Sequence, residues 1–335
     1  MPDPTPRDQV HGIMTGYWIS QAVYVAAKLR IPDILAGRPR PVEELAEATG
    51  THAPTLYRLL RTLASVGIFS EESPRHFRLT PQAETLRSDA PETLWPLAIM
   101  FGEEHYHAWG GLLESVRTGK TAFDRLYGKP IFAYLAENPE KARVFDAAMT
   151  AIHGRETAGV LDHFDMSDIT TLADIGGGNG SNLIGILGRY PAMRGILFDL
   201  PHVVDHARAA LEDAGVADRC EVIGANFFKP IAVQADAYFL RHVIHDWDDD
   251  DSRRILQNVR AAMSPGARLL VVEHVLPPGD VPSHGKFVDL NMLIMPGGLE
   301  RTEDEFRRLY ESAGFRLTRV VPSYGDISVI EGQPA

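Results

Sequence analysis

His245 and Glu273 are the residues of this 335-residue chain best suited to proton transfer. An imidazole has an unperturbed pKa of about 6.5, so it can accept a proton near neutral pH. A neighbouring carboxylate would fix the tautomer of the imidazole and stabilise the imidazolium that forms. An isolated histidine more often has a structural role. Both residues lie at the end of short apolar runs, however, and this position predicts an acid–base site.

A glycine-rich turn, LADIGGGNG at Leu172–Gly180, separates an apolar run from a predicted helix. The next apolar run ends at Asp199, 23 positions after Gly176. In a nucleotide-type site the glycines let the backbone approach the ligand, and the acid binds the paired ribose hydroxyls. A dinucleotide fingerprint would need glycine at the position of Ser181, so the Gly-x-Gly-x-Gly spacing favours S-adenosylmethionine over NAD. A tight turn without a ligand is the structural alternative.

Further residues that could contact a ligand follow the later apolar runs. Asn226 and Phe227 come after the third run and could hydrogen-bond to a purine and stack on it. Arg241 comes after the fourth run. Ligands on an open parallel sheet bind at the carboxyl ends of its strands. We therefore expect these residues to share one rim of the sheet with His245 and Glu273.

The elements that must position these residues begin near Ile169, where apolar runs start to alternate with helical segments. This alternation predicts an α/β fold with a doubly wound, mostly parallel sheet. The last two runs are joined only by Ser-Tyr-Gly, which is too short for a helical crossover, so they should pair antiparallel. The predicted strands are Thr171–Ile175, Gly195–Leu200, Glu221–Gly224, Ala235–Leu240, Arg268–Glu273, Phe315–Pro322 and Asp326–Glu331.

The N-terminal part of the chain predicts helices and a winged helix. Residues 9–36 place apolar and bulky aromatic residues at helical spacing, which favours packing against a second subunit. Residues 41–80 predict a helix, a turn, a helix whose buried face includes Leu56 and Val66, and a hairpin. Winged helices commonly bind DNA. Residues 37–89 contain seven arginines and seven acidic residues, however, so they offer no basic face and a dimerisation role is favoured.

These patterns predict three segments. Residues 1–90 form a helical and winged-helix dimerisation domain, residues 91–165 form a helical linker that contributes to a substrate pocket, and residues 166–335 form the cofactor-binding catalytic domain. Methionines adapt to the shape of a flat aromatic ligand, although they are equally common in cores. The candidate pocket residues are Trp109, Met149, Asn291, Met292 and Met295.

The composition excludes several classes of protein. The net charge of −12 argues against binding to nucleic acid or to an anionic membrane. No apolar stretch approaches the roughly 20 residues needed to span a bilayer, and residues 1–12 are polar and proline-rich, unlike a signal peptide. The single cysteine, Cys220, excludes an internal disulfide and favours a cytoplasmic location. No group of cysteines and histidines has the spacing of zinc ligands, so no metal is expected.

Four motifs resemble the plant-type family of S-adenosylmethionine-dependent O-methyltransferases, whose bacterial members modify natural products. They are LRHVIHDWD at Leu240–Asp248, ADIGGGNG at Ala173–Gly180, FDLPH at Phe198–His202 and PGGLERT at Pro296–Thr302. The resemblance covers essentially the whole chain, because the winged helix is also that family's dimerisation domain. It implies a homodimer, a seven-stranded class I methyltransferase sheet, and methylation of a phenolic hydroxyl on an aromatic small molecule.

The resemblance also implies roles for individual residues. His245 matches the family's catalytic base, and Glu273 and Glu300 match the two carboxylates that flank and orient it. The positions that match the cofactor site are Asp174, Gly176, Gly178, Asp199, Leu200, Asn226, Phe227 and Arg241. Many members have aspartate in place of Asn226 and lysine in place of Arg241. Asparagine can still hydrogen-bond to an adenine amino group, and arginine keeps the positive charge.

Three alternative functions stay open. A protein of the same fold could bind S-adenosylmethionine and catalyse hydroxylation or decarboxylation, but the complete set of His245, Glu273 and Glu300 favours methyl transfer. A ligand-sensing winged-helix regulator is disfavoured by the neutral charge of residues 37–89. An NAD-dependent dehydrogenase is disfavoured by Ser181.

Overall fold

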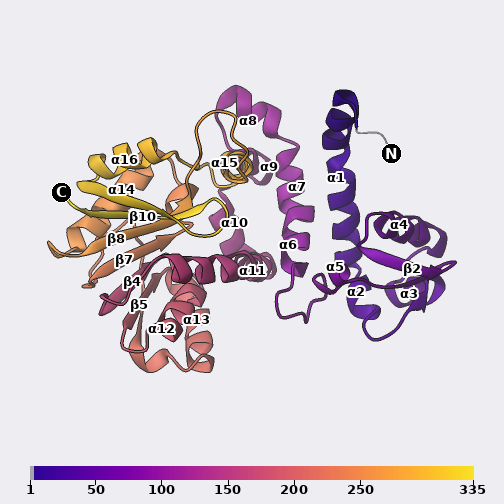
Figure 1. The fold of residues 1–335 in the computed structure, drawn as a ribbon, viewed down its shortest axis with the longest axis horizontal. Coiled ribbons are helices and arrows are strands. Elements are labelled where there is room, and N and C mark those ends of the chain that lie inside the picture. The colour runs from indigo at the N-terminus through magenta and orange to yellow at the C-terminus, as the bar shows by residue number, and fades with distance from the viewer. Residues whose placement is uncertain (1–3) are drawn as a thin grey trace. The chain divides into compact units, whose positions relative to one another are not determined.

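The computed structural model describes residues 4–335, except for the side chains at positions 153, 155 and 206. The chain divides into two compact units (Figure 1). The first consists of Met1–His107 and Asn138–Ala151, and the second of Ala108–Glu137 and Ile152–Ala335. Each unit has its own hydrophobic core.

The first unit contains the winged helix that the sequence predicts. Three of its described strands form a sheet of order β1-β3-β2, and β2 and β3 make the predicted hairpin. Leu56 and Leu60 of α4 are buried, as expected, but Val66 is 47% exposed because it lies just beyond the end of that helix. The elements of this unit are α1 (Pro6–Lys28), α2 (Ile31–Ile34), β1 (Arg40–Pro41), α3 (Val42–Thr49), α4 (Ala53–Ser65), β2 (Phe69–Ser73), β3 (His76–Leu79), α5 (Pro81–Glu84), α6 (Trp95–Met100) and the π-helix η1 (Phe101–His105).

Short helices precede the sheet of the second unit, and one long helix contributes residues to both units. The short ones are α7 (Tyr106–Trp109), α8 (Leu112–Thr118), α9 (Ala122–Tyr127) and α10 (Ile131–Glu137), and the long one is α11 (Pro139–His163). Each short helix ends near a glycine or a proline-containing turn, as Gly119 and Gly128 show with their left-handed backbone.

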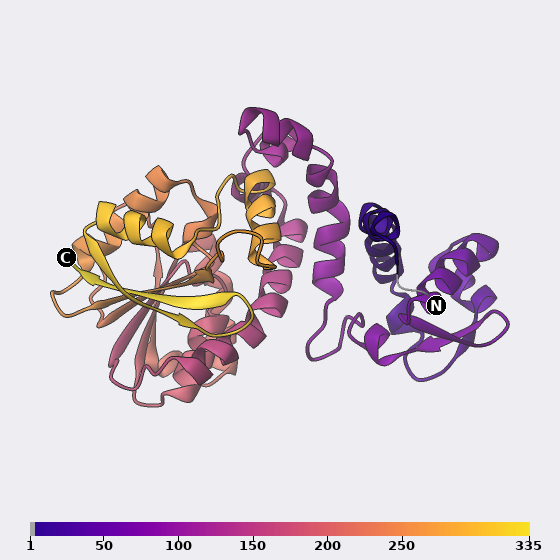
Figure 2. The same cartoon turned by 45° about the horizontal axis from the view of Figure 1, so that its top comes forward.

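Seven strands of the described residues form the sheet of the second unit, in the order β6-β5-β4-β7-β8-β10-β9. The first five pair in parallel, and β10 pairs antiparallel with both β8 and β9. The predicted α/β fold and the antiparallel hairpin are thereby confirmed, and Figure 2 shows the hairpin in yellow. The strands are β4 (Thr171–Ile175), β5 (Arg194–Asp199), β6 (Cys220–Gly224), β7 (Ala237–Arg241), β8 (Arg268–His274), β9 (Phe315–Pro322) and β10 (Ile327–Pro334).

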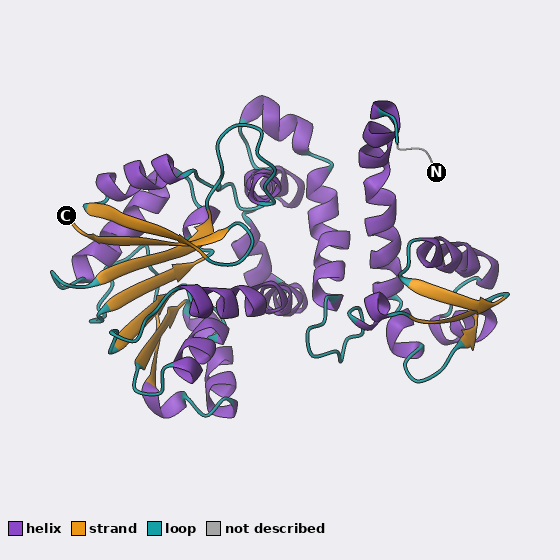
Figure 3. Cartoon of the chain, viewed as in Figure 1, coloured by secondary structure: helices purple, strands orange, loops and turns teal. Residues whose placement is uncertain are grey.

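Helices cover both faces of this sheet (Figure 3). Successive residues of a strand point to opposite faces, so Ala173 packs in one core layer and Leu172 in the other. One layer is completed by α14 (Asp249–Ala262) and α16 (Glu303–Ser312), and the other by α12 (Ser181–Arg189), α13 (Pro201–Asp213) and the end of α11. The remaining elements are η2 (Ala217–Arg219), η3 (Ile244–Asp246) and α15 (Gly285–Ile294). Apart from the edge strand β6, the parallel strands are buried on both faces and almost continuously apolar, which explains why their bounds are close to the predicted ones.

Candidate active site

The glycine turn after β4 orients the carboxylate of Asp199. Gly178 has a φ of 58°, a left-handed conformation that favours glycine. The backbone N–H of Gly178 donates to Oδ2 of Asp199 at 2.8 Å, and the N–H of Leu200 donates to Oδ1 at 2.6 Å. Burial nevertheless raises the pKa of Asp199 above its ordinary value. A carboxylate held in this way keeps lone pairs for a pair of hydroxyl groups.

Asp174 lies against the same turn. An ideal Cβ atom on Gly177 would lie 2.7 Å from Oδ2 of Asp174, so a side chain at this position would displace the carboxylate. Neither carboxylate oxygen of Asp174 has a hydrogen-bond partner among the described residues. Burial, helped by the charge of Asp199, raises the pKa of Asp174 to about 7. Because an unpartnered buried carboxylate costs free energy, this site fits a ligand that brings an ammonium group.

Phe227 and Asn226 extend the rim beyond β6. An ideal Cβ atom on Gly176 would lie 3.7 Å from Cε1 of Phe227, so this ring borders the glycine turn. The side-chain amide of Asn258 donates to the backbone oxygen of Phe227 at 2.8 Å and holds the segment in place. Asn226 is exposed, and its Oδ1 accepts a hydrogen bond from the N–H of Phe228 at 2.8 Å. The structure therefore places Phe227 next to Gly176.

Arg241 has surroundings that the sequence did not indicate. Its guanidinium is completely buried and forms an ion pair with Glu156 of α11. It also donates to Asn182 Oδ1 of α12 and to Thr157 Oγ1. The same carboxylate oxygen of Glu156 lies 2.9 Å from Nε2 of His242, whose backbone φ is 51°. Arg241 thus ties the end of β7 to two helices, and its predicted contact with the cofactor stays a prediction.

The imidazole of His245 lies in η3, immediately after β7, and contacts Glu300. Nδ1 of His245 lies 2.6 Å from Oε1 of Glu300, and both side chains are buried. The two residues are 55 positions apart in the chain. The bond fixes Nδ1 as the nitrogen that carries a proton, so Nε2 is left to exchange a proton with a ligand. This is the arrangement that general acid–base chemistry needs.

Glu273 reaches His245 through the backbone. Its Oε1 accepts hydrogen bonds from the backbone N–H groups of Ile244, at 2.7 Å, and of His245, at 3.1 Å. Glu273 therefore holds the η3 turn that carries the imidazole, while Glu300 contacts the imidazole itself. The two predicted carboxylates come together around His245, but by different contacts.

Gly298 and Arg301 fix the position of the loop that carries Glu300. Both lie in the PGGLERT motif, but the sequence predicted no role for either of them. An ideal Cβ atom on Gly298 would lie 1.9 Å from the backbone oxygen of His245. Arg301 is fully buried and donates to the backbone oxygens of Ile244, at 3.3 Å, and of Trp247, at 3.1 Å. The loop that carries Glu300 is thus bonded along its length to the turn that carries His245.

The charges around His245 determine its proton affinity. Burial lowers the pKa of His245, but the carboxylates of Glu300, Asp246 and Glu273 outweigh burial and raise it to about 10. Burial raises the pKa of Glu273 to about 7 and that of Asp246 to about 6. Nε2 of His245 lies 3.6 Å from Oδ1 of Asp246. These carboxylates therefore stabilise the imidazolium that forms when Nε2 accepts a proton.

The candidate pocket residues fall into three groups. Trp109 Nε1 donates to Oδ1 of Asn291 at 3.1 Å, which joins α7 to α15 within the second unit. Met292 and Met295 are buried, at 8% and 1% exposure. Met149 belongs to the first unit. The contacts of these five residues with a substrate stay predictions.

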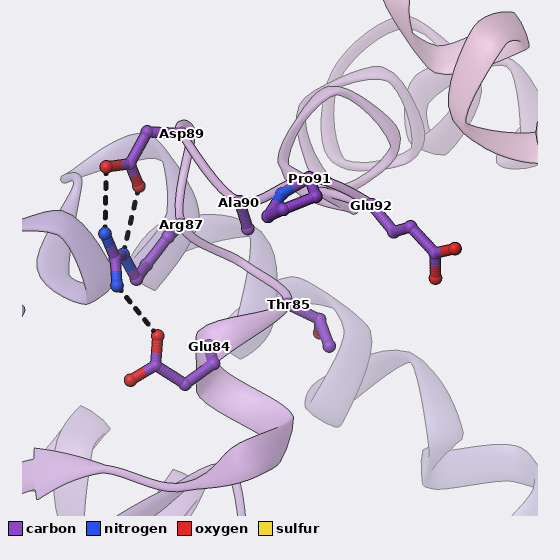
Figure 4. Close-up of a pocket in the computed structure, with 7 residues that line it drawn as sticks. All are labelled: Glu84, Thr85, Arg87, Asp89, Ala90, Pro91 and Glu92. Atoms are coloured by element: carbon purple, nitrogen blue, oxygen red, sulfur yellow. Dashed lines mark hydrogen bonds and ion pairs between the residues drawn. The ribbon is translucent and has the colours of Figure 1, made fainter.

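The first unit also has a pocket that contains none of the five candidate pocket residues (Figure 4). Arg87 in it is paired with Glu84 and with Asp89. Its lining residues are Glu84, Thr85, Arg87, Asp89, Ala90, Pro91 and Glu92, and none of them was predicted as a site residue.

The described residues contain neither a helix that could cross a membrane nor a cluster that could hold a metal ion. No helix among residues 4–335 has both the length and the apolar character to cross a membrane. Within the same part of the chain, histidines, cysteines and acidic residues form no group of three or more that could hold a metal ion.

Comparison with known proteins identifies both parts of the chain. Residues 109–316 match the O-methyltransferase domain, and residues 12–89 match the O-methyltransferase dimerisation domain. Phenazine O-methyltransferase PhzM of Lysobacter antibioticus is 47% identical over 322 residues, which cover 96% of this chain and 94% of that protein. The crystal structure of LaPhzM has a TM-score of 0.95 and 46% identity, covering 99% of this chain and 100% of its own.

Two further relatives are an O-methyltransferase whose structure contains ligands and a protein that is named as a hydroxylase. The structure of NcsB1, an O-methyltransferase from neocarzinostatin biosynthesis, contains S-adenosylmethionine and 2-hydroxy-5-methyl naphthoic acid; its TM-score is 0.84 at 31% identity, covering 94% of this chain and 96% of that one. Aclacinomycin 10-hydroxylase RdmB of Streptomyces purpurascens is 37% identical over 303 residues, covering 88% of this chain and 81% of that protein.

Proposed function

Because this chain belongs to the O-methyltransferase family, we propose that it transfers the methyl group of S-adenosylmethionine to a phenolic hydroxyl of an aromatic small molecule, with His245 as general base. The observation that carries the proposal is the buried contact of 2.6 Å between Nδ1 of His245 and Oε1 of Glu300. A base of this kind is what a phenol needs, because its proton has a pKa near 10 by analogy with tyrosine.

The residues of the glycine turn fit the cofactor. Bound S-adenosylmethionine supplies a methyl group already activated by a sulfonium centre. Asp174, whose carboxylate has no partner among the described residues, would bind the ammonium group. Asp199 would accept hydrogen bonds from the ribose hydroxyls, and Phe227 would pack against the adenine ring. The structure of NcsB1, which contains S-adenosylmethionine, supports the assignment.

His245 and the two glutamates supply the proton chemistry. Nε2 of His245 would take the phenolic proton as the oxygen attacks the methyl carbon, a contribution of roughly 10²–10⁴ in rate. Glu300 would stabilise the imidazolium at Nδ1, and Glu273 would keep the η3 turn in place. Holding the reacting atoms in line would contribute about 7–11 kcal/mol more.

The test is incubation of the purified protein with S-adenosylmethionine and a panel of phenols, among them a hydroxyphenazine and 3-amino-4-hydroxybenzoate. Mass spectrometry should find a product heavier by one methylene group for at least one phenol, together with an equal amount of S-adenosylhomocysteine. A hydroxylated or decarboxylated product without S-adenosylhomocysteine would overturn the proposal and favour the chemistry named for RdmB.

We also propose that the chain is a homodimer and is located in the cytoplasm. The dimerisation domain and the apolar side chains of α1 support the dimer: Ile13 is 80% exposed, Met14 67% and Trp18 59%. The lone Cys220 supports the location, because secreted proteins more often carry disulfides.

A further inference from the structure

His242 has a backbone conformation that residues with a side chain rarely adopt. Its φ of 51° lies in the left-handed region. Among residues 4–335, only two other non-glycine residues, Arg30 and Arg75, have a positive φ. His242 directly follows the last residue of β7, and η3, which carries His245, begins two residues later. His242 is therefore the residue at which the chain turns from the strand towards the proposed base.

One carboxylate oxygen contacts two consecutive side chains at this turn. Oε2 of Glu156, in α11, accepts a hydrogen bond from Arg241 and lies 2.9 Å from Nε2 of His242. An ionised carboxylate can only accept, so Nε2 of His242 is the donor. Consecutive side chains of an extended strand point to opposite faces of the sheet and could not reach the same atom. The left-handed conformation of His242 brings both side chains to Glu156, and the two hydrogen bonds in turn stabilise that conformation.

The ring of His242 packs beside the ring of His245. The two ring centres are 4.9 Å apart, and the ring planes are inclined by 36°. Glu156 and Arg241 are buried, and the side chain of His242 is 8% exposed. Burial, together with the charges of His245 and Arg241, lowers the pKa of His242 well below its ordinary value. His242 is therefore a neutral ring that donates to Glu156 and adds no charge next to His245.

We propose that Glu156 is a positioning residue for the methyl transfer: it holds His242 in the left-handed conformation, and this conformation sets the direction from which His245 enters the site. The proposal rests on the proposed function. Glu300 contacts the imidazole of His245, and Glu273 contacts its backbone. Glu156 acts from a third element, α11, through His242. The arrangement is stable because a buried carboxylate that lost a partner would leave both groups unsatisfied.

The alternative role of Glu156 is only to neutralise the buried guanidinium of Arg241. Arg241 also donates to Thr157 and to Asn182, so it keeps hydrogen-bond partners when Glu156 is replaced by glutamine. The two roles differ in how they depend on His242. Neutralisation of Arg241 needs no particular residue at position 242, whereas positioning acts through the conformation of that residue.

The first test compares His242→Ala with His242→Gly. Both variants lose the imidazole, but glycine adopts a positive φ readily and alanine does not. We expect kcat to fall about tenfold or more for His242→Ala and less than about threefold for His242→Gly, with KM for the phenol within about twofold of the wild type. Equal losses of kcat in the two variants would overturn the proposal, because the ring and not the turn would then be what matters.

The second test measures the effect of Glu156→Gln in two backgrounds. In the otherwise wild-type chain, Glu156→Gln should lower kcat about tenfold. In the His242→Gly background it should lower kcat less than about twofold, because glycine needs no anchor to keep the turn. Glu212→Gln, at an exposed position of α13, is the control and should match the wild type. The same loss in both backgrounds would contradict the proposal and leave neutralisation of Arg241 as the role of Glu156.

The third test needs no substrate. In protein labelled with ¹⁵N-histidine, the NMR signal of the Nδ1 proton of His245 is assigned by its loss in His245→Gln. Its chemical shift should change in Glu156→Gln and in His242→Ala, and an unchanged shift in Glu156→Gln would overturn the proposal. If the wild type methylated no phenol, the proposed function would fail, while this measurement would still decide whether Glu156 positions His245.

Discussion

At the scale of single residues, the site depends on which atoms of two glutamates face His245. Glu300 contacts the imidazole, and Glu273 contacts the backbone of the turn that carries it. The resemblance to the O-methyltransferase family implied that both carboxylates flank the histidine but could not assign these different contacts.

Replacing His245 by alanine removes the proposed proton acceptor and leaves the candidate cofactor residues in place. We expect kcat to fall by about 10²–10⁴-fold, while the dissociation constant for S-adenosylmethionine, measured by calorimetry, stays within about twofold of the wild type. His163→Ala is the matched control. Near-normal turnover of His245→Ala would rule out the base assignment.

The pH dependence of kcat/KM should reflect the raised pKa of His245. The base must be neutral, and the carboxylates raise its pKa from 6.5 to about 10, so kcat/KM should increase with pH across this range. In Glu300→Gln a negative charge that stabilises the imidazolium is lost, so the rising limb should move to lower pH. The pH profiles of the wild type and of Glu300→Gln are measured with the same phenol, so that the titration of the phenol contributes equally to both. A shift to higher pH would contradict the assignment.

At the scale of elements, two loops on neighbouring parts of the sheet fix each other. The turn after β7 carries His245, and the loop before α16 carries Glu300. The N–H of Leu299 donates to the backbone oxygen of His245 at 2.9 Å, and Arg301 bonds to both ends of the η3 turn. The geometry of the His245–Glu300 pair is therefore a property of these two loops.

Gly298→Ala tests the fit of these loops. The added methyl group would lie 1.9 Å from the backbone oxygen of His245, so the loops must separate. We expect a loss of about 1–3 kcal/mol in the free energy of unfolding, measured by urea denaturation, together with a lower kcat.

Gly188→Ala is the control for this substitution. Gly188 is an exposed residue of α12 with no atom within 4 Å of an added Cβ. The substitution Gly188→Ala should increase the free energy of unfolding by about 0.5–1 kcal/mol. Equal stability of Gly298→Ala and the wild type would show that the loops are not closely packed.

At the scale of the whole molecule, the chain combines a dimerisation domain with a catalytic domain of one enzyme family. The first unit leaves apolar side chains of α1 exposed, and contiguous exposed apolar surface usually marks an interface. A second copy of the chain is the partner that the family indicates.

Charged substitutions on α1 should therefore dissociate the dimer. For Ile13→Asp combined with Trp18→Asp, we expect the dissociation constant of the dimer to increase about 100-fold or more, measured by light scattering over a dilution series. Val116→Asp, at an exposed apolar position of α8 in the second unit, is the control. A monomeric wild type would contradict the proposed homodimer.

Local patterns in the sequence determined the elements and the family. Apolar runs of strand length predicted Thr171–Ile175 and Phe315–Pro322 with the bounds that the structure has. Thr171–Ile175 lies inside the sheet and is buried almost throughout, whereas the edge strand Phe315–Pro322 begins with alternating buried and exposed residues. The glycine turn and the acid at Asp199 predicted the cofactor because the conformation of a turn and its approach to a ligand depend on a few neighbouring residues.

Only the tertiary structure decided which distant groups meet. His245 and Glu300 are 55 positions apart, and Arg241 pairs with Glu156 across 85 positions. The periodicity of the sequence does not predict such contacts, because the distance in space between these residues depends on how the helices pack on the sheet. The sequence thus predicted that His245 and a carboxylate share one rim of the sheet, and the packed fold decided which atoms of His245, Glu273 and Glu300 meet.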